Sequence, residues 1–292
     1  MAEAPLFCAP SPAKVNLFLE VPARRDDGFH ELETIFAELD FADELELRPT
    51  RRAGIVEFRC SDPSVPRDGS NLVVRALSRL LEEFDLRIGL EARLSKRIPL
   101  GGGLGGGSSN AAVALRLGEA ALRRRLDDAR RAELALALGS DVPFFLAGGT
   151  QLGRGRGELL TPLDAFALDL VLVTPPLHCA TAEVFAALRV PDQPRPSEAL
   201  VQALAAGDLE GVAAGLFNRL EEPAFALWSE LAEVKQALLA AGCRGALMSG
   251  SGASVFGLCE SPEEAAAVAA KLDHARPVRT VIDDSPATPA GS

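Results

Sequence analysis

Apolar and polar residues alternate along much of the first sixty residues. Residues 15–21 place valine and leucine at every second position, which is the pattern of a half-buried β-strand. The same alternation recurs at 32–47 and 55–60, where we expect further strands joined by short turns. Residues 26–28, Asp-Asp-Gly, mark a turn. The chain is therefore expected to open with a β-rich region.

Helical spacing takes over after residue 70. Residues 70–84 form an amphipathic pattern that Ser70 or Asn71 can cap. A strand at 90–98 follows, and small and apolar residues at 110–126 then predict a second helix. This part of the chain therefore adds helices to the β-rich opening.

From residue 127 onward, short helices mix with strands, which indicates an α+β arrangement. The expected helices lie at 127–138, 197–206, 208–217, 222–240 and 261–273, with helical character also beginning at 181. The expected strands lie at 167–174, 246–258 (strand, glycine loop, strand) and 278–282. Residues 153–157, Gly-Arg-Gly-Arg-Gly, favour a turn, so we expect a domain boundary nearby.

The most unusual stretch is residues 99–110, in which six of twelve residues are glycine. Each glycine costs about 0.5–1 kcal/mol relative to alanine in regular structure. A run with this many glycines therefore indicates that the backbone needs a conformation or a close contact that other residues do not allow. One such requirement is the close approach of backbone amides to an anion. Because a predicted helix follows, its unpaired N–H groups and its dipole favour phosphate binding. Ser108 and Ser109 add hydroxyl groups and can cap that helix.

Three other interpretations of this stretch fit less well. A Walker A loop ends in Gly-Lys-Ser/Thr, and Gly107 stands where the lysine is required. Gly101, Gly103 and Gly106 match the dinucleotide fingerprint, but so dense a run matches almost any spacing. The alternating strand before it also differs from the apolar strands of a parallel sheet. A flexible linker is polar and does not join a strand to an apolar helix.

Composition narrows the class of protein. The 292 residues suffice for one large or two ordinary domains, and 48% of them are hydrophobic. No apolar run of about 18 residues predicts a transmembrane helix, and the first residues lack the pattern of a signal peptide, so a cytoplasmic location is expected. Thirty basic and 41 acidic residues give a net charge of −11, which argues against nucleic acid or an anionic membrane as a partner.

Cysteine and histidine usage indicates no metal site. The five cysteines are odd in number and include no Cys-x-x-Cys pair, so the sequence predicts neither a disulfide framework nor a zinc site. We expect most of them to be small buried residues. The three histidines are too scattered to indicate metal binding. There is no tyrosine and one tryptophan, so a platform for stacking a base has to use phenylalanine.

Polar residues that interrupt these patterns are candidates for chemistry, and each has an ordinary alternative. Lys14 and Asn16 share the polar face of the first strand, where solvated residues of an edge strand are equally expected. Phe29 and His30 follow the first turn, where they either serve recognition or pack the turn onto the core. Asp141 precedes a proline at an expected helix start, and its ordinary role is an N-cap.

Three stretches together resemble the three motifs of the GHMP kinases, the superfamily of galacto-, homoserine, mevalonate and phosphomevalonate kinases. They are residues 10–21, 99–112 and 247–258. The middle stretch resembles the family's ATP-phosphate loop, and the resemblance spans about residues 9–282. Together with residues 27–32 and 139–145, the motifs are most similar to those of kinases that act on a CDP-linked polyol.

The resemblance implies a two-domain α+β fold. The N-terminal domain, residues 1–157, is expected to be an α/β domain like domain 2 of ribosomal protein S5 and to carry the ATP loop. The C-terminal domain, residues 158–283, is expected to be a ferredoxin-like α+β domain, with the active site in the cleft between the two. Residues 284–292 are rich in proline, serine and alanine, so a disordered tail is expected.

The same resemblance implies the site residues. Asp141 matches the family's catalytic aspartate, Lys14 matches its partnering lysine, and Ser108 is an expected Mg²⁺ ligand, since Mg²⁺ prefers oxygen donors. The residues expected near ATP are Asn71, Lys96, Pro99, Leu100, Gly101, Gly102, Gly103, Leu104, Gly105, Gly106, Gly107, Ser108 and Ser109. The residues expected to contact the second substrate are Asn16, Phe29, His30, Thr181, Phe185, Ser249, Gly250 and Gly252.

One of these residues departs from the family pattern. The family often has tyrosine where Phe29 stands. Phenylalanine keeps an aromatic face for stacking on a cytosine ring, but it lacks the hydroxyl group. Any hydrogen bond made by that hydroxyl is therefore lost in this chain.

The activity implied by the resemblance is ATP- and Mg²⁺-dependent phosphorylation of a hydroxyl group on a CDP-linked polyol, a step towards isoprenoid precursors. Two alternatives stay open, namely another small-molecule kinase of the homoserine or mevalonate type and a nucleotide sensor without turnover. The presence of both Lys14 and Asp141 speaks against a sensor, which has no need of a base. The expected partners are ATP and the substrate, with the chain as a monomer or weak homodimer.

Overall fold

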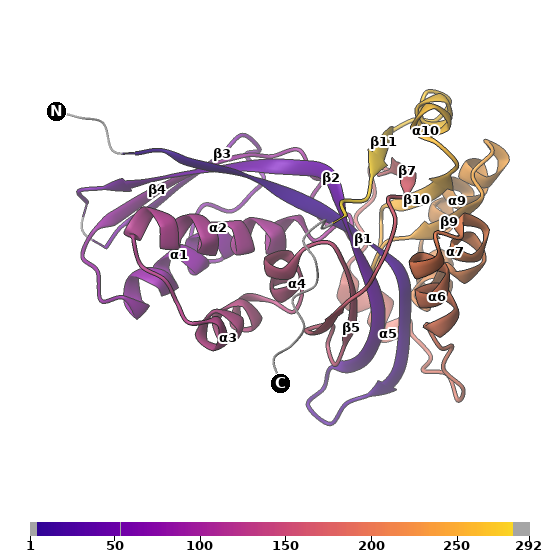
Figure 1. The fold of residues 1–292 in the computed structure, drawn as a ribbon, viewed down its shortest axis with the longest axis horizontal. Coiled ribbons are helices and arrows are strands. Elements are labelled where there is room, and N and C mark those ends of the chain that lie inside the picture. Colours follow the sequence, from indigo (N-terminus) through magenta and orange to yellow (C-terminus); the bar gives the residue numbers. More distant parts are fainter. Residues whose placement is uncertain (1–4, 53, 283–292) are drawn as a thin grey trace. The chain divides into compact units, whose positions relative to one another are not determined.

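The computed structural model describes residues 5–52 and 54–282, and Figure 1 shows the elements. The chain divides into two compact units. One contains residues 1–13, 41–100 and 105–147, and the other contains residues 14–40, 101–104 and 148–292. Strands β1 (Phe7–Arg24) and β2 (His30–Thr50) contribute one segment to each unit. The tail expected at 284–292 lies outside the described residues.

The first unit packs helices against a sheet (Figure 1). The later half of β2 pairs antiparallel with β4 (Gly89–Ser95), which pairs parallel with β3 (Val56–Cys60). The helices are α1 (Leu72–Glu83), α2 (Gly106–Leu122), α3 (Asp128–Leu138) and α4 (Val142–Ala147). Gly118 permits the tight crossing of α1 and α2, because a Cβ there would lie 2.5 Å from a methyl carbon of Leu80.

The second unit is built on antiparallel pairings. The early half of β2 pairs with β5 (Thr150–Arg154), and β5 pairs with β6 (Leu159–Pro162). A separate four-stranded sheet has the order β11-β7-β10-β9, with β7 at Asp169–Val173, β9 at Gly245–Met248, β10 at Val255–Cys259 and β11 at Ala275–Arg279. The remaining elements are α5 (Thr181–Ala187), α6 (Glu198–Ala206), α7 (Leu209–Gly215), β8 (Phe217–Asn218), α8 (Glu221–Leu227), α9 (Ser229–Ala240) and α10 (Pro262–Ala269). Helices α9 and α10 pack on this sheet (Figure 1).

The α+β class predicted from the sequence is confirmed, but three details of the pattern were wrong. Residues 32–47, where several strands and short turns were expected, lie in the single strand β2. The polar Asp43 does not mark a turn there, because it is buried within the strand. The first helix after the glycine run begins at Gly106 rather than at 110. The apolar pattern missed this start because the first turn of the helix carries no apolar residue. The helix expected at 222–240 is divided at Trp228, whose φ of −135° is extended. Among the described residues, no helix is long and apolar enough to cross a bilayer.

Candidate functional site

The glycine run ends at the N-terminus of α2. Its N-cap, Gly105, adopts φ 69° in the left-handed region and makes no side-chain cap hydrogen bond. Ser108 and Ser109 therefore lie inside the first turn, and the expectation that they cap the helix was wrong. The N–H groups of Gly106, Gly107 and Ser108 have no intrahelical acceptor, and together with the helix dipole they suit an anion. The N–H of Ser109 already donates to the carbonyl oxygen of Gly105 at 2.9 Å.

Buried side chains anchor the first turn of α2 to strand β1. The hydroxyl group of Ser11 donates to Oδ1 of Asn110 at 2.6 Å and lies 3.0 Å from the hydroxyl oxygen of Ser109. All three residues are buried. Ser109 therefore supports the helix start, whereas Ser108 is half-buried.

Asp141 lies immediately before α4, which packs against α2. The turn before α4 is closed by a hydrogen bond from the N–H of Val142 to the carbonyl oxygen of Gly139 at 3.1 Å. A Cβ on Gly139 would lie 3.7 Å from the hydroxyl oxygen of Ser108. The turn that precedes α4 and carries Asp141 therefore approaches the first turn of α2 at Ser108.

Lys96 and Asn71, both expected near ATP, have partners within the first unit. The ammonium group of Lys96 donates to Oδ2 of the buried Asp43 at 2.7 Å and to the carbonyl oxygen of Ile98. It lies beside α2, since a Cβ on Gly106 would be 3.2 Å from Lys96 Nζ. Asn71 caps α1 by accepting from the N–H of Val73 at 2.8 Å. Their contribution to nucleotide binding stays a prediction.

The three motifs of the sequence converge on one carbonyl oxygen in the second unit. Lys14 Nζ donates to the carbonyl oxygen of Gly103 at 2.8 Å, and Ser249 Oγ donates to the same atom at 3.0 Å. Lys14 Nζ also donates to Asn16 Oδ1 at 2.6 Å. A Cβ on Gly250 would lie 3.5 Å from Lys14 Nζ. Side chains far apart in the sequence thus form one polar cluster around Gly103.

Glycine is required at the centre of this cluster. Gly103 has φ 73°, and a Cβ there would lie 2.1 Å from the carbonyl oxygen of Ser249. No side chain fits such a distance, and the φ value alone would strain one. The two glycine-rich motifs therefore meet backbone to backbone at Gly103. The approach of backbone amides to an anion, which the glycine density predicted, stays a prediction.

Two buried residues that support the cluster were missed from the sequence. Thr34 Oγ1 accepts from Asn16 Nδ2 at 2.8 Å, and Asn218 Nδ2 donates to the carbonyl oxygens of Met248 and Gly250 at 2.7 and 2.8 Å. Asn218 lies in the two-residue strand β8, where the sequence predicts the end of a helix. A single polar residue in such a position gives no signal of its role.

The aromatic candidates lie on β2, the turn before it, and α5. The ring centroids of His30 and Phe185 are 5.0 Å apart, while Phe29 lies at the turn and is 49% exposed. Burial, and to a lesser extent the positive charge of Arg24, lower the pKa of His30 below its usual 6.5, so the imidazole is neutral at neutral pH. A neutral imidazole offers one donor and one acceptor.

Thr181, at the start of α5, faces the third motif. Its hydroxyl oxygen lies 2.8 Å from that of Ser251, the residue between Gly250 and Gly252. Gly252 has φ 89°, and a Cβ there would lie 3.0 Å from Met248 Sδ. The glycine loop after β9 is therefore tightly packed on one side and bears hydroxyl groups on the other.

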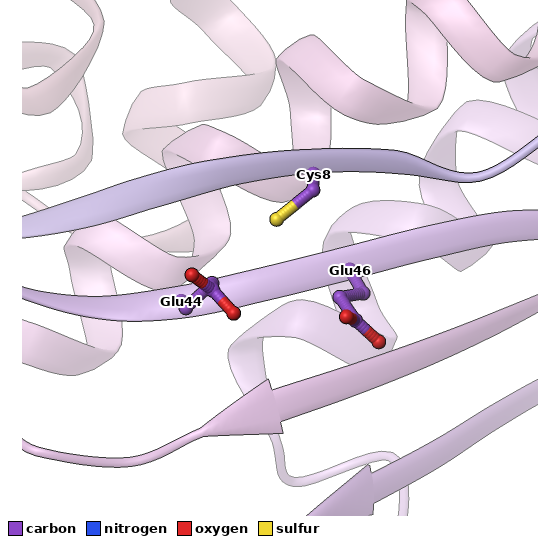
Figure 2. A group of neighbouring side chains, drawn as sticks. All are labelled: Cys8, Glu44 and Glu46. Atoms are coloured by element: carbon purple, nitrogen blue, oxygen red, sulfur yellow. The ribbon is translucent and has the colours of Figure 1, made fainter.

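One group of metal-type donors that the sequence did not indicate lies on the first unit. Among residues 5–52 and 54–282, Cys8, Glu44 and Glu46 have ligand atoms within 4.8 Å of one another, and Figure 2 shows the thiol of β1 beside the two carboxylates of β2. Burial, and then the two carboxylates, raise the pKa of Cys8, which disfavours the thiolate that binds metals. Exposed carboxylates of this kind are common without an ion, so we do not interpret the group as a metal centre.

The expectation that most of the cysteines are buried is confirmed. Cys179, Cys243 and Cys259 are buried, whereas Cys60 is half-buried and Cys8 is exposed. All five are free thiols. The sulfur atoms of Cys243 and Cys259 lie 3.8 Å apart within the core of the second unit.

Comparisons with known proteins agree with this geometry. The model of the GHMP kinase N-terminal domain matches residues 71–149, and that of the GHMP kinase C-terminal region matches residues 200–277. A 4-diphosphocytidyl-2-C-methyl-D-erythritol kinase of Pelotomaculum thermopropionicum is 44% identical over 89% of this chain and 91% of its own length. The domain boundary at residue 157 stays a prediction.

Solved structures agree as well. A crystal structure of 4-(cytidine 5'-diphospho)-2C-methyl-D-erythritol kinase matches with a TM-score of 0.81 and 40% identity, over 94% of this chain and 99% of its own. A homoserine kinase from Cytophaga hutchinsonii matches with a TM-score of 0.75 over 97% of this chain and 96% of its own, but with 22% identity, so it supports the fold alone. The chain therefore belongs to the GHMP kinase family and, within it, to the 4-diphosphocytidyl-2-C-methyl-D-erythritol kinases.

Proposed function

We propose that this chain transfers the γ-phosphoryl group of ATP to the 2-hydroxyl group of 4-diphosphocytidyl-2-C-methyl-D-erythritol, giving the 2-phosphate and ADP on the non-mevalonate route to isoprenoid precursors. The relatives named for this activity share 37–44% identity with most of the chain. The observation that carries the proposal is that Lys14 and Ser249 both donate a hydrogen bond to the carbonyl oxygen of Gly103. It unites the three motifs that define the family.

The glycine run and the start of α2 are proposed to bind the phosphates of ATP. Phosphoryl transfer depends on positioning and charge stabilisation more than on covalent chemistry. Backbone N–H groups at a helix N-terminus supply both without a lysine in the loop. Asn71 and Lys96 border this region and are proposed to lie near the nucleotide.

The donor set also fits a magnesium ion. Ser108 and Asp141 offer hard oxygen atoms beside the first turn of α2, and such oxygens are what Mg²⁺ binds. Mg²⁺ bound with ATP neutralises negative charge on the phosphates. Ser108 is the ligand we propose.

Asp141 is proposed as the general base that accepts the proton of the substrate hydroxyl group. Lys14 is proposed to offset the negative charge on the phosphoryl group as it moves. Both roles are carried over from the family motifs. The hydrogen bonds of Lys14 to Asn16 and Gly103 hold its ammonium group in one place, which suits an electrostatic role.

The cytidyl group is proposed to be recognised by aromatic residues of the second unit. Phe29 and Phe185 are proposed to flank the cytosine ring, and the neutral imidazole of His30 is proposed to pair with its polar edge. Asn16, Thr181, Ser249, Gly250 and Gly252 are proposed to contact the rest of the substrate. We also propose that the chain acts in the cytoplasm as a monomer or weak homodimer.

The position of the new phosphate tests this assignment. The purified chain is incubated with ATP, Mg²⁺ and 4-diphosphocytidyl-2-C-methyl-D-erythritol, and the product is examined by ¹H–³¹P correlation. We expect a phosphomonoester on the tertiary carbon, which bears no proton and gives no three-bond coupling to a carbinol proton. A phosphate on a secondary hydroxyl group would contradict the assignment.

A further inference from the structure

Phe29 is held in one orientation before any substrate binds. Its N–H donates to Oδ1 of Asp27 at 3.1 Å, and its carbonyl oxygen accepts from the N–H of Arg25 at 2.8 Å. One face of its ring is covered by the guanidinium group of Arg156, whose Cζ lies 3.8 Å from the ring centroid. The side chain nevertheless remains 49% exposed.

Arg156 comes from the Gly-Arg-Gly-Arg-Gly turn, which the proposed function does not otherwise use. The N–H of Gly157 donates to the carbonyl oxygen of Arg154 at 3.0 Å, and Gly155 adopts φ 71°. The N–H of Leu32, near the start of β2, donates to the carbonyl oxygen of Gly155 at 2.7 Å. The turn is therefore fixed to the strand that follows Phe29, and its geometry sets the position of Arg156.

The guanidinium carbon lies over the ring at the distance of a close cation–π contact. A planar guanidinium group lies well on an aromatic face, and the negative face of the ring attracts the cation. Because Arg156 covers one face, a base has the opposite face for stacking. A ring held in its bound orientation loses less conformational entropy when the ligand arrives.

We propose that Arg156 is a substrate-positioning residue, which holds the ring of Phe29 so that its open face stacks on the cytosine of the substrate. This inference rests on the proposed function. The inference also bears on the presence of phenylalanine at position 29. Phenylalanine has no hydroxyl group whose hydrogen bond could set the orientation of the ring, and the cation of Arg156 sets it instead.

Arg156→Met tests the proposal against a matched control, Arg154→Met. Arg154 lies in the same turn, is more than half exposed and pairs with Glu33 at 3.2 Å, so both variants lose one positive charge from one turn. We expect Arg156→Met to raise the KM for the cytidyl substrate about three- to tenfold, with kcat and the KM for ATP within about twofold of wild type. Arg154→Met is expected to change none of the three by more than about twofold.

A double-mutant cycle separates action through the ring from direct contact with the substrate. In a Phe29→Ala background, Arg156→Met is expected to add less than about a twofold rise in KM, because the ring through which it acts is gone. Arg156→Lys, which keeps the cation without the planar stack, is expected to fall between wild type and Arg156→Met. Equal losses in both backgrounds would overturn the proposal, as would an unchanged KM in Arg156→Met.

Binding of CDP, measured by calorimetry on the same full-length variants, distinguishes a failure of the role proposed for Arg156 from a failure of the proposed function. Absent turnover by the wild type would reject the function. An active wild type whose Kd for CDP is unaffected by Arg156→Met would reject only the role of Arg156. A weakening of three- to tenfold, with a thermal unfolding midpoint like that of Arg154→Met, is the result we expect.

Discussion

At the scale of single residues, the proposed base Asp141 and the proposed cytosine-binding residue His30 are indicated by the sequence in different ways. A lone aspartate before a proline predicts an N-cap as readily as a base, so Asp141 stood out only within the family motif. His30 follows a turn, and no local pattern indicates that its ring lies beside that of Phe185 or that burial lowers its pKa. Residues whose role depends on a partner distant in the sequence are not predictable from local patterns.

Asp141→Asn should abolish most turnover, because asparagine keeps the shape of the side chain and cannot accept the proton. We expect kcat to fall about 10²–10⁴-fold while the Kd for ATP changes little. Asp164→Asn, at an exposed position, is the matched control for the loss of one carboxylate. Turnover near the wild-type value in Asp141→Asn would remove Asp141 from the role of base.

The pH dependence of substrate recognition should report on His30. Its pKa is below 6.5, so the neutral imidazole, which is proposed to pair with cytosine, persists at neutral pH and is lost as the pH falls through that lowered pKa. We expect the KM for the cytidyl substrate to rise on the acid side. The KM for ATP, measured at saturating cytidyl substrate, is the control. The same acid rise in a His30→Gln variant would show that another group titrates.

At the scale of elements, the glycine run was the most informative part of the sequence. Its density predicted backbone amides close to an anion. The structure adds a second reason for glycine, because Gly103 lies against the backbone of Ser249. The strand β2 shows the limit of such patterns. Short turns were expected within residues 32–47, but Asp43 in the middle of that range is buried in the strand and accepts hydrogen bonds from the N–H groups of Arg97 and Ile98. Its partner Lys96 is 53 residues away, too far for any local pattern to reveal.

Lys96→Met should destabilise the first unit, because it leaves the charge of Asp43 buried without its cation. The two side chains are 5% and 0% exposed, and removing one member of such a pair costs about 3–5 kcal/mol. Urea unfolding measures the change, with the exposed Lys271→Met as control. The double variant Lys96→Met with Asp43→Leu should recover part of the loss. A single variant as stable as the control would mean that the pair contributes little.

At the scale of the whole molecule, the net charge of −11 argues against nucleic acid as a partner but carries no information on an anionic small substrate. The chain's motifs lie far apart in sequence and are brought together by the fold. Glu20 of β1 is an example. Its carboxylate accepts from Arg219 at 2.8 and 2.7 Å and from the N–H of Arg195 at 2.8 Å, so three distant segments of the second unit meet there.

Glu20→Gln should lower the free energy of unfolding at neutral pH and make that free energy depend less on pH in the acid range. Burial raises the pKa of Glu20, but the hydrogen bonds from Arg219, Arg195 and Val21 outweigh it and lower the pKa below 4.5. The stability it contributes is thus present above pH 4.5 and is lost as the pH falls through the lowered value. We expect the variant to lose about 3 kcal/mol of unfolding free energy near pH 7 and this loss to narrow as the pH falls below 4.5. Glu198→Gln, at an exposed position, is the control in urea unfolding. A stability difference between wild type and Glu20→Gln that stays the same at acid pH would contradict this account.

The most direct test of the central claim is ³¹P-monitored turnover of ATP with three separate acceptors, namely 4-diphosphocytidyl-2-C-methyl-D-erythritol, homoserine and mevalonate. The account predicts ADP and a new phosphomonoester resonance with the cytidyl substrate, and neither with the other two. Phosphorylation of homoserine or mevalonate in its place, or binding of ATP with no turnover of any acceptor, would contradict it.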